Sequence, residues 1–496
     1  MKGHDILFIH PPRDFQPLTN PLMTRAQHFI MPMGFFSMAD MVAREGFETR
    51  IINYTLEKIL NPKYSLLKDL KKHEPRVVAV DLHWINHSFG ALEILKLVKK
   101  HLPETFTLLG GYSSAFFARE IIEKFPQVDA IIQGEAEKPI IELLHHINDL
   151  EQVPNLVYRD KKNGNGRIKQ NNRSYVAYDL DDLNFAKVKF LKHWKEYLHH
   201  LEKTLHIAWT VEIARGCPFN CMFCGGGIKA TKPFTNRNRY TLRSPERVLD
   251  DIREMVDVAG TRRVYYSHGY FNATKRHFLK LFSLLKKENI DIGADLEAYR
   301  LPIEKTFIKS FIKSHNKEES MMWFSVRNFS ESTRKKMASL VGKYDDSFNY
   351  TNQDLDDFIS ICTKFDLPVR LFWDIGYPGE SVIDFTRNIF KSVKLFGEGI
   401  AGKKNVSMWT EPIITSPGSL VFHHSEQLGI KLFSKSFIDY YNLMKQPMRF
   451  QPLDMQMDYK TPYFPTFALK ILIRVLFSMN LFGLLVSDKR IGSEVY

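Results

Sequence analysis

Three of the four cysteines lie close together in the sequence, at Cys217, Cys221 and Cys224, with the spacing C-x3-C-x2-C. Three thiolates on one short loop can bind three irons of a 4Fe–4S cluster and leave the fourth iron open to an outside ligand. A structural zinc site would need a fourth Cys or His in register. The loop contains no His, and Cys362 lies 138 positions further on. The spacing therefore predicts an iron–sulfur cluster with one open iron.

The rest of the composition is that of an ordinary folded protein. Of 496 residues, 44% are hydrophobic and 25% are charged, which excludes disorder as the dominant state. Four cysteines cannot make a disulfide framework in a chain of this length, so we expect a reduced, cytoplasmic protein in which Cys362 is a buried packing residue. The net charge of +13 is compatible with nucleic acid, a membrane surface, an anionic ligand or a scattered surface charge. No basic–aromatic motif is recognisable, so we expect no nucleic-acid partner.

Short apolar runs alternate with amphipathic helical patterns over the first 145 residues, which predicts βαβ units and a Rossmann-like parallel sheet. The expected strands are Asp5–Ile9, Thr49–Tyr54, Val77–Leu82, Thr105–Leu109 and Asp129–Ile132, with helices at Phe35–Arg44, Ala91–His101, Ala115–Phe125 and Pro139–Ile147. Ligands of such sheets bind at the carboxyl ends of the strands. The residues expected at those ends include Pro12, His83, Gly110, Gly111, Gly134 and Glu135. Gly110 and Gly111 either let the backbone approach a ligand or only make a tight turn.

The cysteine loop resembles that of the radical S-adenosylmethionine (SAM) superfamily. In that family an aromatic residue, here Phe223, directly precedes the third cysteine and packs near the adenine. The resemblance implies SAM as a cofactor, with Gly225 and Gly226 beside it. It also implies a partial (β/α)6 barrel with functional residues at the carboxyl ends of its strands. The expected barrel strands are Ile207–Ile213, Arg262–Ser267, Asp291–Glu297, Met321–Val326, Val369–Ile375 and Val406–Ile414, and Ser244 is the expected cap of the first helix after the cluster loop.

The chain departs from the family pattern at the second barrel strand. The family often has an acidic pair there, where this chain has Ser267, His268 and Gly269. In the family, backbone groups at this position hold the amino group of SAM, so we expect Ser267 and Gly269 to do so. His268 is either an acid or base on the substrate side or a packing residue.

Two further barrel strands carry expected SAM contacts. Ser325 and Arg327 replace the usual G-x-E-S of the fourth strand, and we expect them to meet the SAM ribose or carboxylate. Gly376 belongs to a segment that resembles the fifth-strand signature. We expect Gly379 and Glu380 to open the helix that follows.

The N-terminal half resembles the cobalamin-binding domains that are joined to radical SAM barrels. The resemblance rests on Gly34 before a helix, on Gly110–Gly111, on Gly134–Glu135 and on Val153–Arg159. Domains that supply an axial histidine carry D-x-H-x-x-G after the first strand, but here Phe15 and Gln16 follow Asp14. We therefore predict that bound cobalamin lacks a lower histidine ligand. The alternative is that the domain has lost cobalamin.

Together these resemblances imply an enzyme that cleaves SAM reductively at the cluster and, with cobalamin, methylates an unactivated carbon of a small-molecule or lipid-like substrate. A flavodoxin- or ferredoxin-type reductant is implied as a partner. One alternative is a radical SAM cyclase or oxidoreductase that uses the cobalamin domain for something other than methyl transfer. Another is a non-catalytic iron–sulfur or cobalamin sensor, which the open iron disfavours because a sensor does not need one.

The expected fold is α/β, with four parts along the chain. A Rossmann-like cobalamin-binding domain (1–147) is followed by a connector (148–205), the partial barrel (206–429) and a small, mainly helical C-terminal region (430–496). The connector is expected to hold a polar loop at Lys161–Arg167 and a helix at Phe190–Lys203. The apolar stretch Ala468–Val486 contains Lys470 and Arg474, so no confident membrane span is expected. This helix either caps the barrel or lies on a membrane surface as a peripheral contact.

Overall fold

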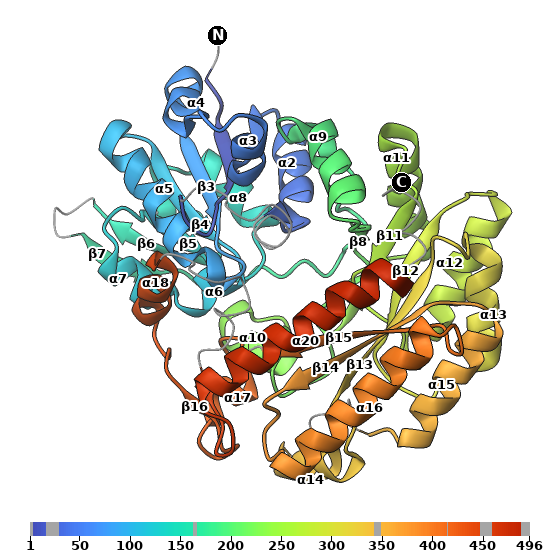
Figure 1. Ribbon diagram of the computed structural model, residues 1–496. Helices are drawn as coiled ribbons and strands as arrows, with labels where there is room; N and C mark the ends of the chain where they lie inside the picture. The colour runs from blue at the N-terminus through green and yellow to red at the C-terminus, as the bar shows by residue number, and fades with distance from the viewer. Residues whose placement is uncertain are drawn as a thin grey trace. The chain divides into compact units, whose positions relative to one another are not determined.

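Figure 1 presents the computed structural model, which describes residues 3–15, 29–161, 166–341, 349–413, 415–446 and 459–487. The chain divides into two compact units. Unit 1 comprises Met1–Leu205, Thr231–Arg239 and Ser434–Met455. Unit 2 comprises His206–Ala230, Tyr240–Phe433 and Gln456–Tyr496.

Unit 1 is built on a seven-stranded sheet in the order β2-β1-β3-β4-β5-β6-β7. The strands are β1 (Ile6–His10), β2 (Thr49–Asn53), β3 (Val77–Asp81), β4 (Phe106–Gly110), β5 (Ala130–Ile132), β6 (Leu156–Asp160) and β7 (Arg167–Gln170). The first five are parallel, and β1 and β3 are buried along their whole length, as expected for strands covered on both faces. This confirms the Rossmann-like prediction. The structure adds β6 and β7, which pair antiparallel and which the sequence analysis assigned to a connector.

The helices of unit 1 follow the βαβ pattern. They are α2 (Gly34–Arg44), α3 (Tyr54–Leu60), α4 (Leu66–His73), α5 (Ser88–His101), α6 (Tyr112–Phe116), α7 (Ala118–Lys124), α8 (Glu137–His145) and α9 (Trp194–His199). The single helix predicted over Ala115–Phe125 is wrong, because α6 and α7 are separate helices that meet at Phe117. The helix predicted over Phe190–Lys203 is instead α9 followed by a π-helical turn at His200–Thr204. The polar loop predicted at Lys161–Arg167 falls mostly on residues 162–165, outside the described residues.

Unit 2 contains a six-stranded, all-parallel sheet in the order β15-β14-β13-β12-β11-β8, which confirms the predicted partial barrel. Its strands are β8 (Trp209–Val211), β11 (Arg263–Tyr266), β12 (Gly293–Ala298), β13 (Met321–Arg327), β14 (Val369–Ile375) and β15 (Val406–Pro412). Its helices include α11 (Pro245–Ala259), α12 (Lys275–Lys287), α13 (Lys305–Ser314), α14 (Glu331–Val341), α15 (Asn352–Lys364) and α16 (Val382–Ile400). Ser244 caps α11 by accepting a hydrogen bond from the backbone of Arg247, as predicted.

The C-terminal residues are mainly helical, as predicted, and contribute to both units. In unit 2 lie α17 (Leu420–His424), the short pair β16 (Lys431–Leu432) and β17 (Tyr459–Lys460), and α20 (Thr466–Ser487). In unit 1, α18 (Phe437–Lys445) contacts α5, and its first backbone N–H groups donate to the Glu120 carboxylate. Within the described residues, no helix combines the length and apolarity that crossing a bilayer requires.

Candidate functional site

The three clustered cysteines occupy one loop between β9 (Ala214–Arg215) and α10 (Ile228–Thr235). The loop closes on itself, because Ile228 donates its backbone N–H to the carbonyl of Cys217 at 2.9 Å, and Gly226 donates to the sulfur of Cys224 at 3.2 Å. None of the three cysteines forms a disulfide in the described structure, and Cys224 is exposed while the other two are half-buried. The loop thus presents three thiolate ligands from a constrained backbone.

This donor set fits an iron–sulfur cluster better than a single ion. The ligands of one ion must converge, and these three sulfurs do not lie within 4.8 Å of one another. In a 4Fe–4S cluster each thiolate binds a different iron, so convergence is not needed. Cys362 is buried on α15, where burial raises the pKa of its thiol, and it plays no part in the loop.

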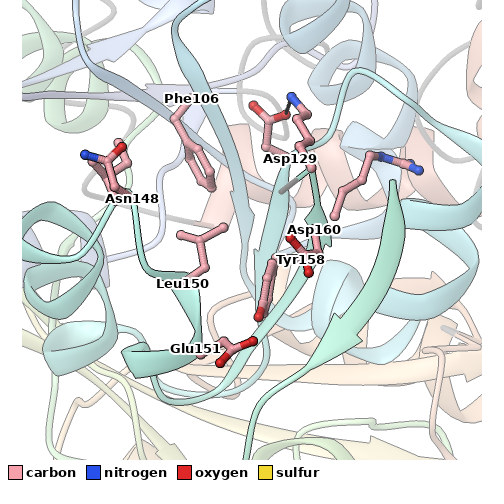
Figure 2. A pocket seen from close by; sticks show the side chains of 10 residues that line it. Phe106, Asp129, Asn148, Leu150, Glu151, Tyr158 and Asp160 are labelled. Carbon is pink, nitrogen blue, oxygen red and sulfur yellow. Dashed lines mark hydrogen bonds and ion pairs between the residues drawn. The ribbon is translucent and has the colours of Figure 1, made fainter. Parts of the chain in front are cut away.

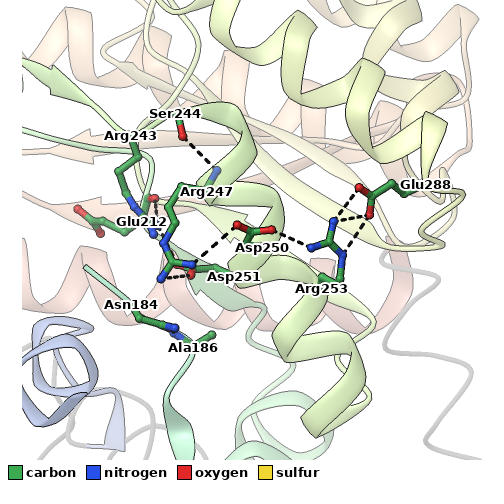
Figure 3. A network of polar contacts seen from close by, with 10 residues as sticks. All are labelled: Asn184, Ala186, Glu212, Arg243, Ser244, Arg247, Asp250, Asp251, Arg253 and Glu288. Carbon is green, nitrogen blue, oxygen red and sulfur yellow. Dashed lines mark hydrogen bonds and ion pairs between the residues drawn. The ribbon is translucent and has the colours of Figure 1, made fainter. Parts of the chain in front are cut away.

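A buried ion pair fastens the cysteine loop to α11 (Figure 3). Arg243 follows β10 (Thr241–Leu242), which pairs with β9 directly before the loop. The side chain of Arg243 is fully buried and donates to Asp251 at 2.8 Å and to the carbonyl of Glu212 at 2.9 Å. Losing either member of the pair would leave an uncompensated buried charge. The pair therefore links the segments on either side of the cysteine loop to α11.

Phe223 contacts Tyr377, the residue that directly follows Gly376 in the sequence. Phe223 is 4% exposed, and its ring meets that of Tyr377 edge-on with centroids 5.5 Å apart. Gly376 has a φ of +73°, and a Cβ there would lie 3.1 Å from Leu469 of α20. The turn after β14 therefore requires glycine for its conformation and its tight packing. In the cysteine loop, Gly225 is buried and Gly226 is exposed beside the sulfur of Cys224.

The end of β11 is shaped by close backbone packing. Ser267 accepts a hydrogen bond from the backbone of Ile213 at 3.1 Å, so its hydroxyl ties β11 to the strand that leads into the cysteine loop. A Cβ on Gly269 would collide with the carbonyl oxygen of Glu297 and would lie 2.7 Å from the ring of Tyr299. His268 is half-buried, and its Nδ1 has no hydrogen-bond partner in the described structure. Desolvation lowers the pKa of His268 to about 4, so the ring is neutral at pH 7 and is a poor general acid.

Ser325 and Arg327 each meet a buried carboxylate. Ser325 donates a hydrogen bond to Glu297 at 2.9 Å, and Arg327 lies 3.4 Å from Asp374. Burial raises the pKa of both carboxyl groups, which Ser325 and Arg327 partly oppose. Arg327 has a φ of +65° at a register shift of β13, a strained conformation that redirects its side chain. The sequence analysis did not select Glu297, although acidic residues in an expected barrel strand, here Asp295 and Glu297, are a signal that could have found it.

The structure also corrects the expectation that Gly379 and Glu380 begin the helix after β14. Gly379 and Glu380 do not open a helix, because α16 starts at Val382 with Ser381 as its cap. Glu380 is 2% exposed and accepts hydrogen bonds from Asn328 and Asn388. Burial raises its pKa to about 7.

In unit 1, the structure brings His83, Gly110 and Gly111 together at the ends of β3 and β4. Gly111 has a φ of +101°, and a Cβ there would lie 2.7 Å from the backbone nitrogen of His83. Desolvation by the surrounding protein lowers the pKa of His83, while the nearby Asp81 acts in the opposite direction. Gly34 begins α2, and nothing lies within 4 Å of a Cβ built there.

The remaining candidates of unit 1 have structural contacts. The carbonyl oxygen of Pro12 faces Gly90 of α5, where a Cβ would collide with it. Glu135 pairs with the buried Arg237 at 2.5 Å and accepts from the backbone of Ala177 at 2.7 Å. Gly134, with a φ of +91°, lies against Thr235. These contacts favour structural roles for Gly134 and Glu135.

A separate cavity of about 250 Å³ lies in unit 1, where Phe106 begins β4 and Tyr158 and Asp160 end β6 (Figure 2). This is the edge of the sheet opposite the carboxyl ends of the parallel strands. Its carboxylates are already paired, since Lys161 lies 2.7 Å from Asp129 and Lys169 lies 2.8 Å from Asp160. None of the candidate residues lines this cavity.

Two family models match the chain, in the order that the fold suggests. The B12 binding domain model matches residues 19–144, and the Radical SAM superfamily model matches residues 211–353. Among solved structures, the chain is similar to the radical S-adenosylmethionine methyltransferase TsrM from Kitasatospora setae, determined with tryptophan substrate and a SAM analogue. The TM-score is 0.63 at 14% identity, covering 96% of this chain and 88% of that one.

Curated relatives include two proteins named for methyl transfer and one cyclase. An uncharacterized methyltransferase of Pyrococcus horikoshii, PH0819, is 22% identical over 433 residues, which is 83% of this chain and 87% of that one. The hopanoid C-3 methylase of Methylococcus capsulatus is 26% identical over 48% of this chain and 42% of its own. The anaerobic magnesium-protoporphyrin IX monomethyl ester cyclase of Cereibacter sphaeroides is 26% identical over 39% of this chain and 30% of its own length. The chain thus combines a segment that matches the B12 binding domain with a later segment that matches the Radical SAM superfamily, and its fold is similar to that of TsrM.

Proposed function

We propose that this enzyme is a cobalamin-dependent methyltransferase that methylates an unactivated carbon of a small-molecule or lipid-like substrate. The observation that carries the proposal is the loop of three cysteines outside any disulfide, Cys217, Cys221 and Cys224, in a chain that also matches a B12 binding domain. When bound, the cluster, SAM and cobalamin supply the radical and methyl-transfer chemistry. One relative is named a cyclase, which favours a second candidate function. This candidate is a radical SAM cyclase or oxidoreductase that does not transfer a methyl group.

The chain's own residues bind and orient these groups. Cys217, Cys221 and Cys224 hold the cluster. The backbone around Ser267 and Gly269 and the side chains of Ser325 and Arg327 hold SAM at the ends of β11 and β13. Phe223, packed on Tyr377, provides an apolar surface for the adenine and excludes water. His268 is neutral at pH 7 and therefore carries no extra proton to donate as a general acid. A flavodoxin- or ferredoxin-type protein supplies the electron.

We propose further that cobalamin binds at the edge formed by Pro12, His83, Gly110 and Gly111, without a lower histidine ligand. Gly111 supports this placement, because its positive φ and close backbone contact leave the ends of β3 and β4 without a covering side chain. The readout is the electron paramagnetic resonance spectrum of reduced, Co(II) cobalamin. A histidine ligand splits each cobalt line through its nitrogen nucleus, so this proposal expects unsplit lines.

A lipid-like substrate is consistent with an unusual apolar surface of unit 2. Nine of the thirteen exposed large hydrophobic side chains in the described structure lie on α16, on α20 or just before α20. They are Val382, Ile383, Phe390, Val393, Ile400, Tyr463, Phe467, Ile471 and Val475, which we call the apolar face. The two helices contact one another, and Figure 1 shows them running roughly parallel.

Basic residues accompany this apolar face. Helices α16 and α20 carry five basic residues, Arg387, Lys391, Lys394, Lys470 and Arg474, and only two acidic ones, Asp384 and Glu398. The opposite side of α20 is buried through Leu469, Ile473 and Leu476, so the helix caps the barrel and still exposes apolar residues. Exposed apolar side chains among basic ones are typical of surfaces that bind anionic lipid. We propose this face as a peripheral membrane contact.

The central experiment compares cysteine variants of the full chain after anaerobic cluster reconstitution. We expect about four irons per chain and dithionite-dependent formation of 5′-deoxyadenosine from SAM in the parent protein. Cys217→Ala, Cys221→Ala and Cys224→Ala are each expected to lose both. The matched control Cys362→Ala also removes one thiol and is expected to retain both. Cleavage of SAM by the triple variant at the parent rate would refute the proposal.

A further inference from the structure

A buried cluster of metal-ligating side chains lies in unit 1, whereas the cysteine loop belongs to unit 2. His10 ends β1, Asp81 ends β3, and His87 ends the 3-10 turn Ile85–His87 that follows. Each offers one ligand atom, and these atoms all lie within 4.8 Å of one another. No other group of three or more His, Cys, Asp or Glu side chains in the described part of the chain converges in this way. The cluster therefore differs from an ordinary scatter of polar residues.

The burial of this cluster is nearly complete. The exposed fractions of His10, Asp81 and His87 are 0%, 5% and 0%. Nδ1 of His10 lies 2.8 Å from Oδ1 of Asp81, and the rings of His10 and His87 are nearly perpendicular with centroids 4.9 Å apart. Exposed acidic groups often gather without an ion, but a buried carboxylate between two imidazoles has lost its water. Such a group needs a compensating partner.

Two atoms of the cluster lack that partner. Nε2 of His10 and Oδ2 of Asp81 are buried and have no hydrogen-bond partner in the described structure. Burying a polar atom without a partner destabilises a fold, so two such atoms on side chains that contact one another call for an explanation. A cation bound between the side chains would use both lone pairs and offset the charge of Asp81.

The donor set indicates the class of ion. Two imidazole nitrogens and one carboxylate oxygen suit borderline divalent transition metals such as zinc, iron or cobalt rather than magnesium or calcium. We propose that His10, Asp81 and His87 bind one divalent transition-metal ion, independently of the cluster held by the cysteine loop.

The test uses zinc as the probe and the full chain. Zinc bound per chain is measured after equilibrium dialysis in the parent and in the triple variant that lacks Cys217, Cys221 and Cys224. Both are expected to bind about one equivalent that survives removal of excess zinc. Asp81→Asn and His87→Phe, made in the triple variant, are expected to bind zinc at least about tenfold more weakly. The matched control His101→Gln, at the end of α5 in the same unit but outside the cluster, is expected to retain it.

A second measurement needs no change in the cluster and remains informative if those variants fail to fold. Cobalt(II) added to the triple cysteine variant is expected to show visible d–d bands without a thiolate charge-transfer band. Absence of such bands, or less than one-tenth equivalent of zinc in that variant, would overturn the proposal. So would unchanged zinc binding by folded Asp81→Asn. The Co(II) cobalamin signal could also show nitrogen splitting that disappears in His10→Phe. That result would mean that His10 binds cobalamin, and it would overturn the proposed metal site too.

Discussion

Ser325 donates a hydrogen bond of 2.9 Å to Glu297 across the neighbouring strands β13 and β12. Glu297 lies among residues that desolvate it, and this burial raises its pKa, while the Ser325 bond and the charge of Arg327 lower it. A group with a raised pKa stabilises the fold below its unfolded pKa, and that stabilisation is lost as the pH rises through the folded pKa. The pair therefore makes the stability of the barrel depend on pH.

The first prediction concerns Ser325→Ala. Removing a donor to a buried charged carboxylate is expected to lower the free energy of unfolding by about 1.5–3 kcal/mol at pH 8. The loss is smaller at pH 5, where a larger fraction of Glu297 is protonated. Urea unfolding of unit 2 at the two pH values measures this. Ser310→Ala, on the exposed side of α13, is the control and is expected to change stability equally at both. An equal loss for Ser325→Ala at both pH values would contradict the account.

Glu380 gives a second pH prediction. Its pKa is raised by burial to about 7, so it destabilises unit 2 increasingly as the pH rises from about 4.5 through 7. Glu380→Gln keeps an oxygen that accepts from Asn328 and Asn388, and it removes the titration. We expect the urea midpoint of the parent to fall between pH 6 and pH 8.5 and that of the variant to fall less.

The control for Glu380 is Glu304→Gln. Glu304 is exposed, and its hydrogen bond from Lys275 lowers its pKa, so it is already ionised at pH 6. The control is expected to show the same midpoint difference as the parent. If the urea midpoint of Glu380→Gln falls between pH 6 and pH 8.5 by as much as that of the parent, then Glu380 does not titrate in this range.

Gly269→Ala tests the close packing at the end of β11. The added Cβ would meet the carbonyl oxygen of Glu297, which is fixed in the backbone and cannot rotate away. We expect a loss of about 1–3 kcal/mol in unfolding free energy together with a lower affinity for SAM. Gly397→Ala, in the last turn of α16 with nothing within 4 Å of the new Cβ, is the control. It is expected to stabilise by about 0.5–1 kcal/mol and to leave SAM binding unchanged.

The apolar face predicts a preference for anionic membranes. The full chain is expected to float with vesicles that contain phosphatidylglycerol and to float less with pure phosphatidylcholine. Truncating α20 would confuse the result, because Leu469 packs on Gly376. We therefore change exposed residues only, and expect Phe390→Ser with Phe467→Ser to reduce flotation at least about threefold. Leu60→Ser, an exposed change in unit 1, should have no effect. If all of these proteins float equally with the anionic vesicles, the proposed membrane contact is refuted.

Much of the architecture could be predicted because it depends on local patterns. Buried parallel strands such as Val77–Asp81 are continuous apolar runs, and Ser244 before Pro245 marks a helix start. The strands β6 and β7 were missed because β7 is short and polar and because the two strands pair antiparallel at the edge of the sheet, outside the βαβ pattern.

The site was predicted only where a short motif carries it. The cysteine loop is contiguous, so its spacing is visible in the sequence. Glu297 and Ser325 come from different strands, as do His10 and Asp81, and only the pairing of those strands brings them together. Likewise, the resemblance marked Gly269 as a SAM contact, but the packing that requires glycine there is visible only once the position of Glu297 is known.

The measurement that tests methyl transfer most directly is anaerobic turnover with SAM that carries a deuterated methyl group. Reconstituted enzyme with cobalamin and a reductant is supplied with lipid and water-soluble extracts of the producing cells, and products are measured by mass spectrometry. The account predicts 5′-deoxyadenosine and S-adenosylhomocysteine in about equal amounts, a deuterated methyl group in one product, and loss of all three in the triple cysteine variant. Formation of 5′-deoxyadenosine without S-adenosylhomocysteine would contradict methyl transfer and favour the cyclase or oxidoreductase.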